Sequence, residues 1–253
     1  MYRLFVIAKN NMKKQKGDMI TFLLLTFLAA LMLFDCVSAM TGIGNVLDAK
    51  FEEINGADVM LYTSDTTAAR RISEKAFEKN EHIAEYEVTP QLDMIAKFRK
   101  KGERDFNSYN FFVEAFDEEK SIMNIERPER NLLPREVLIP YNMKGVFTVG
   151  DVLQLKLEDD VYDFTVAGYL QDPYFCSTIN ISVYCICLHR DVMDELADEH
   201  PNVVTRENIF KGRLSAADRK AGYLTSDLEK EIEDIYKDER AKYNGEGSFG
   251  YLL

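Results

Sequence analysis

The residues that could hold a metal ion in this 253-residue chain gather before its last histidine, His200. Four acids precede it on a short predicted helix: Asp194, Glu195, Asp198 and Glu199. Carboxylates beside an imidazole can bind a divalent cation, but a run of acids on a short helix is usually a solvated face. His82 and His189 stand apart, and none of the three histidines has the Cys/His spacing of a zinc site. The sequence therefore predicts no metal site.

Three cysteines share one apolar part of the chain and could form a disulfide. Cys185 and Cys187 alternate on one predicted strand, so their side chains lie on the same face, and Cys176 precedes them. If the strands pair, Cys176 could bond to either of the other two. Three buried thiols are the alternative. We prefer it because any disulfide leaves one of the three cysteines over.

The motifs that carry nucleotide chemistry or nucleophilic catalysis are missing from the sequence. It contains no Gly-x-x-x-x-Gly-Lys-Ser/Thr loop for nucleotide phosphates and no Gly-x-Gly-x-x-Gly turn for a dinucleotide. No serine lies in a Gly-x-Ser-x-Gly elbow, and the acids are too evenly spread to indicate a catalytic pair. We therefore predict no catalytic residue, no cofactor and no enzyme activity in this chain.

Charge and hydropathy divide the chain into unlike parts. The net charge of −12 disfavours nucleic acid as a partner, and it is the sum of +4 in residues 1–18 and −16 in the rest. Between these parts lies Met19–Met40, 22 residues with Asp35 as the only charge. A helix of this length covers the hydrocarbon core of about 30 Å. No other apolar run is longer than Ile179–Leu188, so the sequence predicts one membrane crossing and excludes a multi-span transporter within it.

The charges that flank the membrane segment predict its orientation. Five basic residues precede the segment, whereas acids dominate after it, so the positive-inside rule puts residues 1–18 in the cytoplasm and 41–253 outside the cell membrane. Residues 1–18 form either an amphipathic helix at the membrane surface or a disordered basic flank. A signal peptide cleaved after Val37 and Ala39 is the alternative to a membrane anchor.

The part after the membrane segment begins with a stalk and a small layer of helix and strand. Apolar residues at helical spacing from Ile43 to Ile54 predict that the helix continues as a stalk over residues 41–56, ended by Asn55-Gly56. We then expect a strand at Ala57–Tyr62, a helix at Thr66–Asn80 capped by Ser64 or Asp65, and extended chain at Glu81–Phe98.

From Tyr109 onward short apolar runs and turn residues predict a β-rich segment. Its clearest element is a hairpin, in which the arms 153–157 and 162–166 alternate apolar and polar residues around Asp159-Asp160. Residues 202–222 are polar and weakly patterned, which predicts a mobile loop. The other expected elements are strands at Asn110–Phe116, Glu136–Tyr141 and Ile179–Leu188, helices at Asp191–Glu199 and Leu224–Tyr243, and a strand at the end of the sequence.

Three segments follow one another in a recognisable order: the basic start FVIAKNNMKKQKGD, then INGADVMLY after the membrane helix, then Val137–Pro173. This order resembles the N-terminal portion of FtsX-like and MacB-type ABC transporter permeases. The last segment is the most specific, with an apolar strand, Val149-Gly150-Asp151, a strand, a turn, and a strand ending in Val166-Ala167-Gly168. Its glycines and Asp151 suit turns, so the motif identifies a domain and not a reaction.

The resemblance implies an α+β fold, with one transmembrane helix at 19–40 and an extracytoplasmic MacB-like domain at 57–253. Residues 57–98 and about 200–253 would form its βαβ-type part, and residues from about 105 to 190 an inserted β-rich part. The implied partners are a separate ATPase on the cytoplasmic side, the lipid bilayer, and a second permease subunit in a homodimer or heterodimer. The permease would couple ATP hydrolysis to export or to an external partner.

Permeases of this family return to the membrane for at least three further spans, which this sequence does not contain. We therefore expect it to be the first part of a longer permease or the product of a truncated gene. The alternative is a single-span sensor or ligand-binding protein with an external domain. Its weakness is that 18 cytoplasmic residues cannot carry an output domain.

Overall fold

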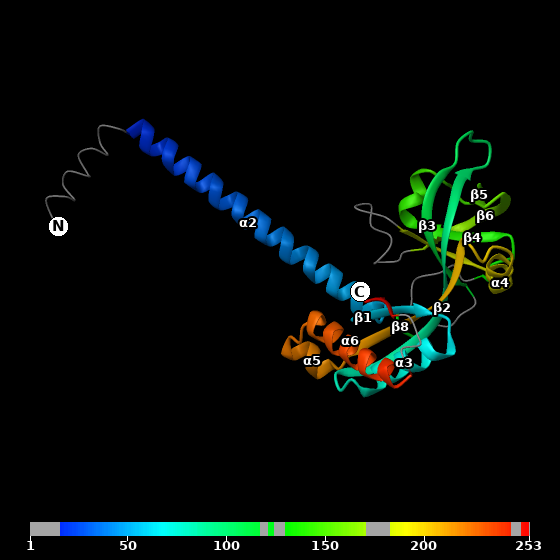
Figure 1. Ribbon diagram of the computed structural model, residues 1–253. Helices are drawn as coiled ribbons and strands as arrows, with labels where there is room; N and C mark the ends of the chain where they lie inside the picture. The colour runs from blue at the N-terminus through cyan, green and yellow to red at the C-terminus, as the bar shows by residue number, and fades with distance from the viewer. Residues whose placement is uncertain (1–15, 117–120, 124–129, 171–182, 244–248, 253) are drawn as a thin grey trace. The chain divides into compact units, whose positions relative to one another are not determined.

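The computed structural model describes residues 16–116, 121–123, 130–170, 183–243 and 249–252 (Figure 1). The chain divides into two compact units, Met1–Glu53 and Ile54–Leu253, which are described separately. The described part of the first unit is a single apolar helix, and the second unit mixes helices and strands, as predicted for an α+β protein.

Helix α2 (Lys16–Glu53) makes up the described part of the first unit. It is continuous over 38 residues, about 57 Å at the usual rise, so the predicted membrane segment and the predicted stalk belong to one helix. The hydroxyls of Thr21, Thr26 and Thr41 each donate to the carbonyl oxygen four residues earlier, which pairs these polar groups inside the helix. The chain leaves the helix through Asn55, whose φ of 53° is the left-handed conformation common after a helix end.

One end of the second unit is a layer of antiparallel strands. Strand β8 (Val204–Leu214) lies between β1 (Val59–Ser64) and the first half of β2 (Ile83–Lys100), antiparallel to both. Strand β9 (Phe249–Leu252) pairs with the other edge of β1. The strands predicted near 57–62, 81–98 and the end of the sequence are therefore confirmed, with bounds shifted by a few residues.

Two helices pack on one face of this layer (Figure 1), α3 (Thr67–Lys79) and α6 (Thr225–Lys242). The residues buried between helices and strands include Val59, Leu61, Ile72, Ala76, Phe77, Phe210, Leu228, Ile232 and Tyr236. Thr66 caps α3 by accepting a hydrogen bond from the amide of Ala69, whereas Ser64 or Asp65 was expected in this role. Helix α6 begins after Leu224 without a side-chain cap.

A buried carboxylate joins the two helices. Glu239 of α6, only 2% exposed, accepts hydrogen bonds from Lys79 of α3 and from Lys242, and the ammonium of Lys75 lies 3.7 Å away. The hydrogen bonds from Lys242 and Lys79 lower the pKa of Glu239 to about 2. This carboxylate therefore fixes α6 to α3 at the end of the apolar stripe.

Glu239→Gln is expected to lower the free energy of unfolding by about 1–2 kcal/mol at pH 7, because charge-assisted hydrogen bonds are lost while the lysines can reach water. Since the pKa of Glu239 is lowered, its contribution is complete above pH 4.5 and disappears as the pH falls to about 2. Urea unfolding of both proteins at several pH values measures this. A difference between them that grows towards pH 2 would contradict the assignment.

The loop predicted for residues 202–222 was wrong. Residues 204–214 form β8, and 216–221 form the short helix α5 (Ala216–Ala221). The segment looked like a loop because it is polar, yet Asn208, Lys211 and Arg213 are buried among neighbouring strands. Hydrogen bonding to strands on both sides holds β8 in place despite its weak apolar pattern.

The other end of the second unit is a ring of paired strands. Its members are β2, β3 (Asn107–Ala115), β4 (Glu136–Pro140), β5 (Val152–Leu157), β6 (Asp160–Leu170) and β7 (Val183–Leu188). The pairings run β2–β3–β7–β4–β6–β5 and return to β2, with one registered pair, Leu138 and Cys187, between β4 and β7. Helix α4 (Arg190–Glu199) packs its buried face against the same apolar core.

The predicted hairpin is confirmed as β5 and β6. Leu157 pairs with Asp160, so the turn residues are Glu158 and Asp159, one position earlier than expected, and Glu158 takes a φ of 50°. Gly150 has a φ of 94°, which explains a glycine before β5. The apolar arm residues are buried inside the ring. The division into a βαβ-type part and an inserted β-rich part stays a prediction.

Candidate functional site

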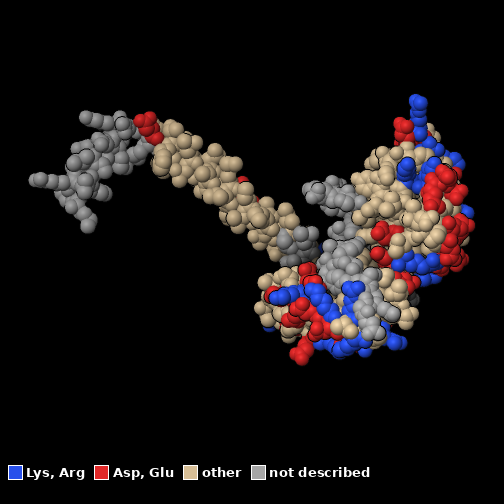
Figure 2. All heavy atoms as spheres, viewed as in Figure 1, with Lys and Arg blue, Asp and Glu red and all other residues tan. Residues whose placement is uncertain are grey.

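Two features of the described chain are candidates for function: the apolar helix and a groove on the ring of strands. In α2, Ile20–Ile43 is long and apolar enough to cross a membrane, and none of this segment is buried inside the structure. Figure 2 shows the helix almost without charged side chains, whereas the second unit displays both signs intermixed. A buried core helix of a soluble protein has the opposite exposure, whereas a membrane anchor and a signal peptide are both apolar and unburied.

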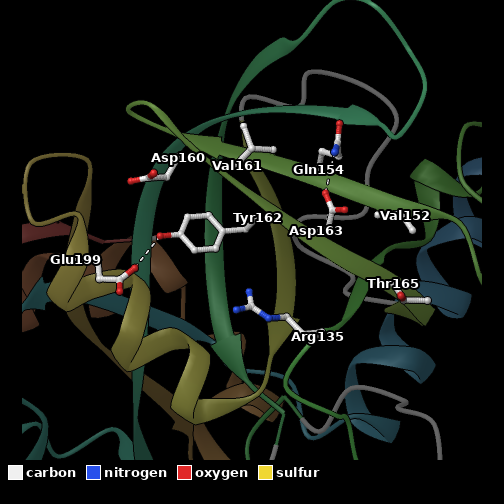
Figure 3. Close-up of a pocket in the computed structure, with 9 residues that line it drawn as sticks. All are labelled: Arg135, Val152, Gln154, Asp160, Val161, Tyr162, Asp163, Thr165 and Glu199. Atoms are coloured by element: carbon white, nitrogen blue, oxygen red, sulfur yellow. Dashed lines mark hydrogen bonds between the residues drawn. The ribbon is translucent and has the colours of Figure 1, made fainter.

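The groove is an open hollow of about 1090 Å³ on the hairpin β5–β6 and its neighbours (Figure 3). Its lining residues are Arg135, Val152, Gln154, Asp160, Val161, Tyr162, Asp163, Thr165 and Glu199. Period-two alternation places Val152 and Gln154 of β5 and Val161, Asp163 and Thr165 of β6 on the outer side of the ring. The sequence showed the hairpin but gave no sign of the groove, because these positions look like an ordinary solvated strand face.

Hydrogen bonds hold the polar groups of one wall of the groove in place. The Gln154 amide accepts from Arg99 Nε at 2.7 Å and donates to Asp163 Oδ1 at 2.7 Å (Figure 3). Asp163 also accepts a hydrogen bond from Lys101, and mainly this contact lowers the pKa of its carboxyl. These groups are paired to one another, so this wall is a rigid polar surface and not a set of reactive side chains.

Tyr162 and Glu199 also line the groove, and Tyr162 contacts His200. Tyr162 donates its hydroxyl proton to Glu199 at 2.7 Å, as the dashed line in Figure 3 shows, and its oxygen also lies 2.7 Å from His200 Nε2. Burial, together with the neighbouring Glu199 carboxylate, raises the pKa of Tyr162. The other imidazole nitrogen, Nδ1, lies 3.1 Å from Glu158 Oε2.

The acids that precede His200 in the sequence contact different partners. Asp194 and Asp198 form ion pairs with Arg206, and Glu195 lies 3.8 Å from Arg135. His82 and His189 lie elsewhere and contact other acids, Asp218 and Asp191. In the part of the chain that the structure describes, no three histidines, cysteines or acids are arranged to hold a metal ion.

Cys185 and Cys187 are buried at 2% and 1% exposure. They alternate with Ile186 and Leu188, which face the core of the ring, so the two cysteines share the other face of β7 as predicted. Cys176 lies outside the described residues, and the choice between a disulfide and three thiols therefore stays open.

No protein-family model matches the chain, and no curated protein matches it. Among solved structures, one match is the extracellular domain of the ABC-type transporter YknZ from Gram-positive bacteria, with 11% identity, 72% of this chain and 94% of that chain covered, and a TM-score of 0.37. Another is a domain of a "putative Permease protein" from Porphyromonas gingivalis, with 14% identity, coverages of 78% and 90%, and a TM-score of 0.38.

Both of these structures are named as parts of transporters or permeases, the class that the sequence resemblance indicates. At such low TM-scores the likenesses carry no argument about this chain.

Proposed function

We propose that the chain is the N-terminal part of the permease subunit of an ABC transporter of the FtsX/MacB type. In this role α2 anchors the protein in the cell membrane, and residues 54–253 form an extracytoplasmic domain. A separate ATPase on the cytoplasmic side hydrolyses ATP, and the permease transmits the resulting motion to an exported substrate or an external partner. The chain itself performs no catalysis.

One observation carries the proposal: a single unburied apolar helix is joined, between Glu53 and Ile54, to an α+β unit that contains the Val137–Pro173 segment of the resemblance. This segment supplies β4, β5 and β6, three members of the ring of strands. The separate ATPase is what the resemblance to these permeases implies.

The test of the proposal is co-purification of the tagged chain, expressed from its own gene and solubilised in mild detergent. We expect an ATPase with a phosphate-binding loop to co-purify, and neighbouring coding sequence to encode at least three further spans. If no ATPase co-purifies and the neighbouring genes are unrelated, the result would favour a membrane-anchored ligand-binding or sensor domain, the second candidate function.

Orientation is tested by a variant in which Ser108→Cys supplies the only thiol, with the four natural cysteines replaced by serine. Ser108 lies on β3 and is exposed. A membrane-impermeant maleimide added to intact cells is expected to label this variant fully, because residues 41–253 are proposed to face outside. Labelling only after lysis would reverse the topology, and an otherwise identical variant without Ser108→Cys is the control.

The groove supports a second candidate, a membrane-anchored ligand-binding or sensor domain. The groove is lined by one guanidinium, Arg135, and three carboxylates, of which Asp163 is already paired with Lys101. The remaining two, Asp160 and Glu199, would favour a cationic ligand. The two candidates differ in the ATPase, which only the permease requires.

A further inference from the structure

The face of the antiparallel layer that points away from α3 and α6 has an apolar cluster of its own. Tyr86 and Val88 of β2 pack towards the helices, so Glu87 between them points to this second face. The buried members of the cluster are Ala57, Met60, Tyr62, Phe112, Ile122, Met123 and Ile209. Ile122 and Met123, 1% and 3% exposed, come from the connection between β3 and β4, so they cover the cluster from outside the paired strands.

Residues 121–123, which we call the strap, are held mainly by side chains of other segments. The Oε2 atom of Glu87 accepts hydrogen bonds from the Ser121 amide at 2.6 Å, from the Ser121 hydroxyl, and from the Ile122 amide at 3.0 Å. Hydrogen bonds to an ionised carboxylate are roughly twice as strong as those between neutral groups. Glu87 is therefore the main acceptor that keeps the strap in place.

Asn55 connects the strap to the first residues after α2. Its side-chain amide donates to the Ser121 carbonyl oxygen at 2.8 Å, and its own carbonyl oxygen accepts from the Met123 amide at 3.0 Å. Asn55 and Met123 both have left-handed backbones, with φ angles of 53° and 57°. Asparagine tolerates this conformation better than methionine does, so the closed strap keeps backbone strain at Met123.

The strap can open without disturbing the sheet beneath it. Opening breaks the hydrogen bonds to Glu87 and Asn55 and releases the strain at Met123, whereas the pairing of β8 with β1 and β2 stays intact. A segment held in this way is expected to open at a lower free energy than the strands, which separate only when the unit unfolds.

We propose that the strap opens and closes by itself over this apolar cluster, with Glu87 as the residue that holds it closed and Asn55 as its connection to the end of α2. When closed, it buries Ile122 and Met123 and fixes the backbone of Asn55, two residues after α2 ends at Glu53. When open, it uncovers apolar side chains of the layer and leaves Asn55 free to change conformation. The proposal uses contacts inside the second unit alone and does not depend on the permease role.

The experiment measures thiol labelling of the full chain in detergent without denaturant. In one protein Ile122→Cys supplies the only thiol, and in the other the natural Cys187 is kept as the only thiol, with the remaining cysteines replaced by alanine. Cys187 is 1% exposed and lies in strand β7, so it reports the opening of the sheet. The thiol at position 122 is expected to react at least about tenfold faster than Cys187, because it requires only local opening.

Glu87→Ala is expected to raise the labelling rate at position 122 at least about tenfold and to leave that of Cys187 within about twofold, because only the strap loses its carboxylate acceptor. Glu81→Ala, at an exposed position before β2, is the control that should change neither rate. Asn55→Gly keeps the left-handed backbone accessible but removes the side-chain amide, so it should raise the rate at position 122 about threefold to tenfold.

Equal rates at position 122 with and without Glu87→Ala would overturn the role of Glu87. If Glu87→Ala accelerated position 122 and Cys187 equally, Glu87 would support the whole unit, which would overturn a strap that opens by itself. An unchanged rate in Asn55→Gly would overturn the connection to the end of α2.

Discussion

Lys211→Met is expected to lower the free energy of unfolding by about 3–5 kcal/mol, the usual cost of removing one member of a buried ion pair. Lys211 and Glu114 have side chains only 2% and 8% exposed, and Nζ lies 3.6 Å from Oε1. Methionine retains most of the aliphatic length of lysine, so little packing is lost. The cost comes from a carboxylate that keeps its charge in a dry environment without the ammonium.

A double variant separates charge from packing. Lys211→Met with Glu114→Leu removes both charges and is expected to recover most of the stability, because apolar pairs of similar volume can replace buried ion pairs. Urea unfolding followed by tyrosine fluorescence suits this protein, which has no tryptophan and whose tyrosines, Tyr2 apart, lie in the second unit. A loss below about 1 kcal/mol in the single variant would show that Glu114 is satisfied by other groups.

Replacing two leucines of the apolar helix with arginine is expected to release the protein from the membrane. Leu28 and Leu31 lie inside Ile20–Ile43, and each arginine near the centre of a span costs about 2.5–3.5 kcal/mol. Together, Leu28→Arg and Leu31→Arg are expected to raise the free energy of membrane insertion by about 6 kcal/mol, which shifts the insertion equilibrium about 10⁴-fold towards the released protein. Resistance to alkaline carbonate extraction measures the inserted fraction.

The matched control places the same charges, three residues apart, on the same helix beyond the membrane segment. Val46→Arg with Ala49→Arg should leave the protein fully resistant to extraction, since these positions lie in the predicted stalk. If the Leu28/Leu31 variant were retained as well as this control, α2 would not be the anchor.

Elements with strong periodicity could be predicted from the sequence. The hairpin β5–β6 and the helices α3 and α6 alternate apolar and polar residues with a clear period, because each has one buried face and one face in water. Bounds and caps were less accurate: Thr66 took the cap expected at Ser64 or Asp65, since helix starts depend on which local hydrogen bond forms.

Strand β8 could not be predicted for a physical reason. Its buried lysine, arginine and asparagine look like surface residues in a sequence, and only partners brought together by the fold make their burial tolerable. The groove was missed for a different reason, because its lining residues on β5 and β6 alternate as on an ordinary solvated strand face.

Strand β2 is shared by both ends of the second unit. Its 18 residues, about 60 Å of extended chain, pair first with β8 and then with β3 and β5. Neither apolar core can lose this strand without exposing the other, so the unit should melt in one cooperative transition. In the proposed permease, a load applied at one end of the second unit would reach the other end directly through β2, since the same strand is hydrogen-bonded into both ends.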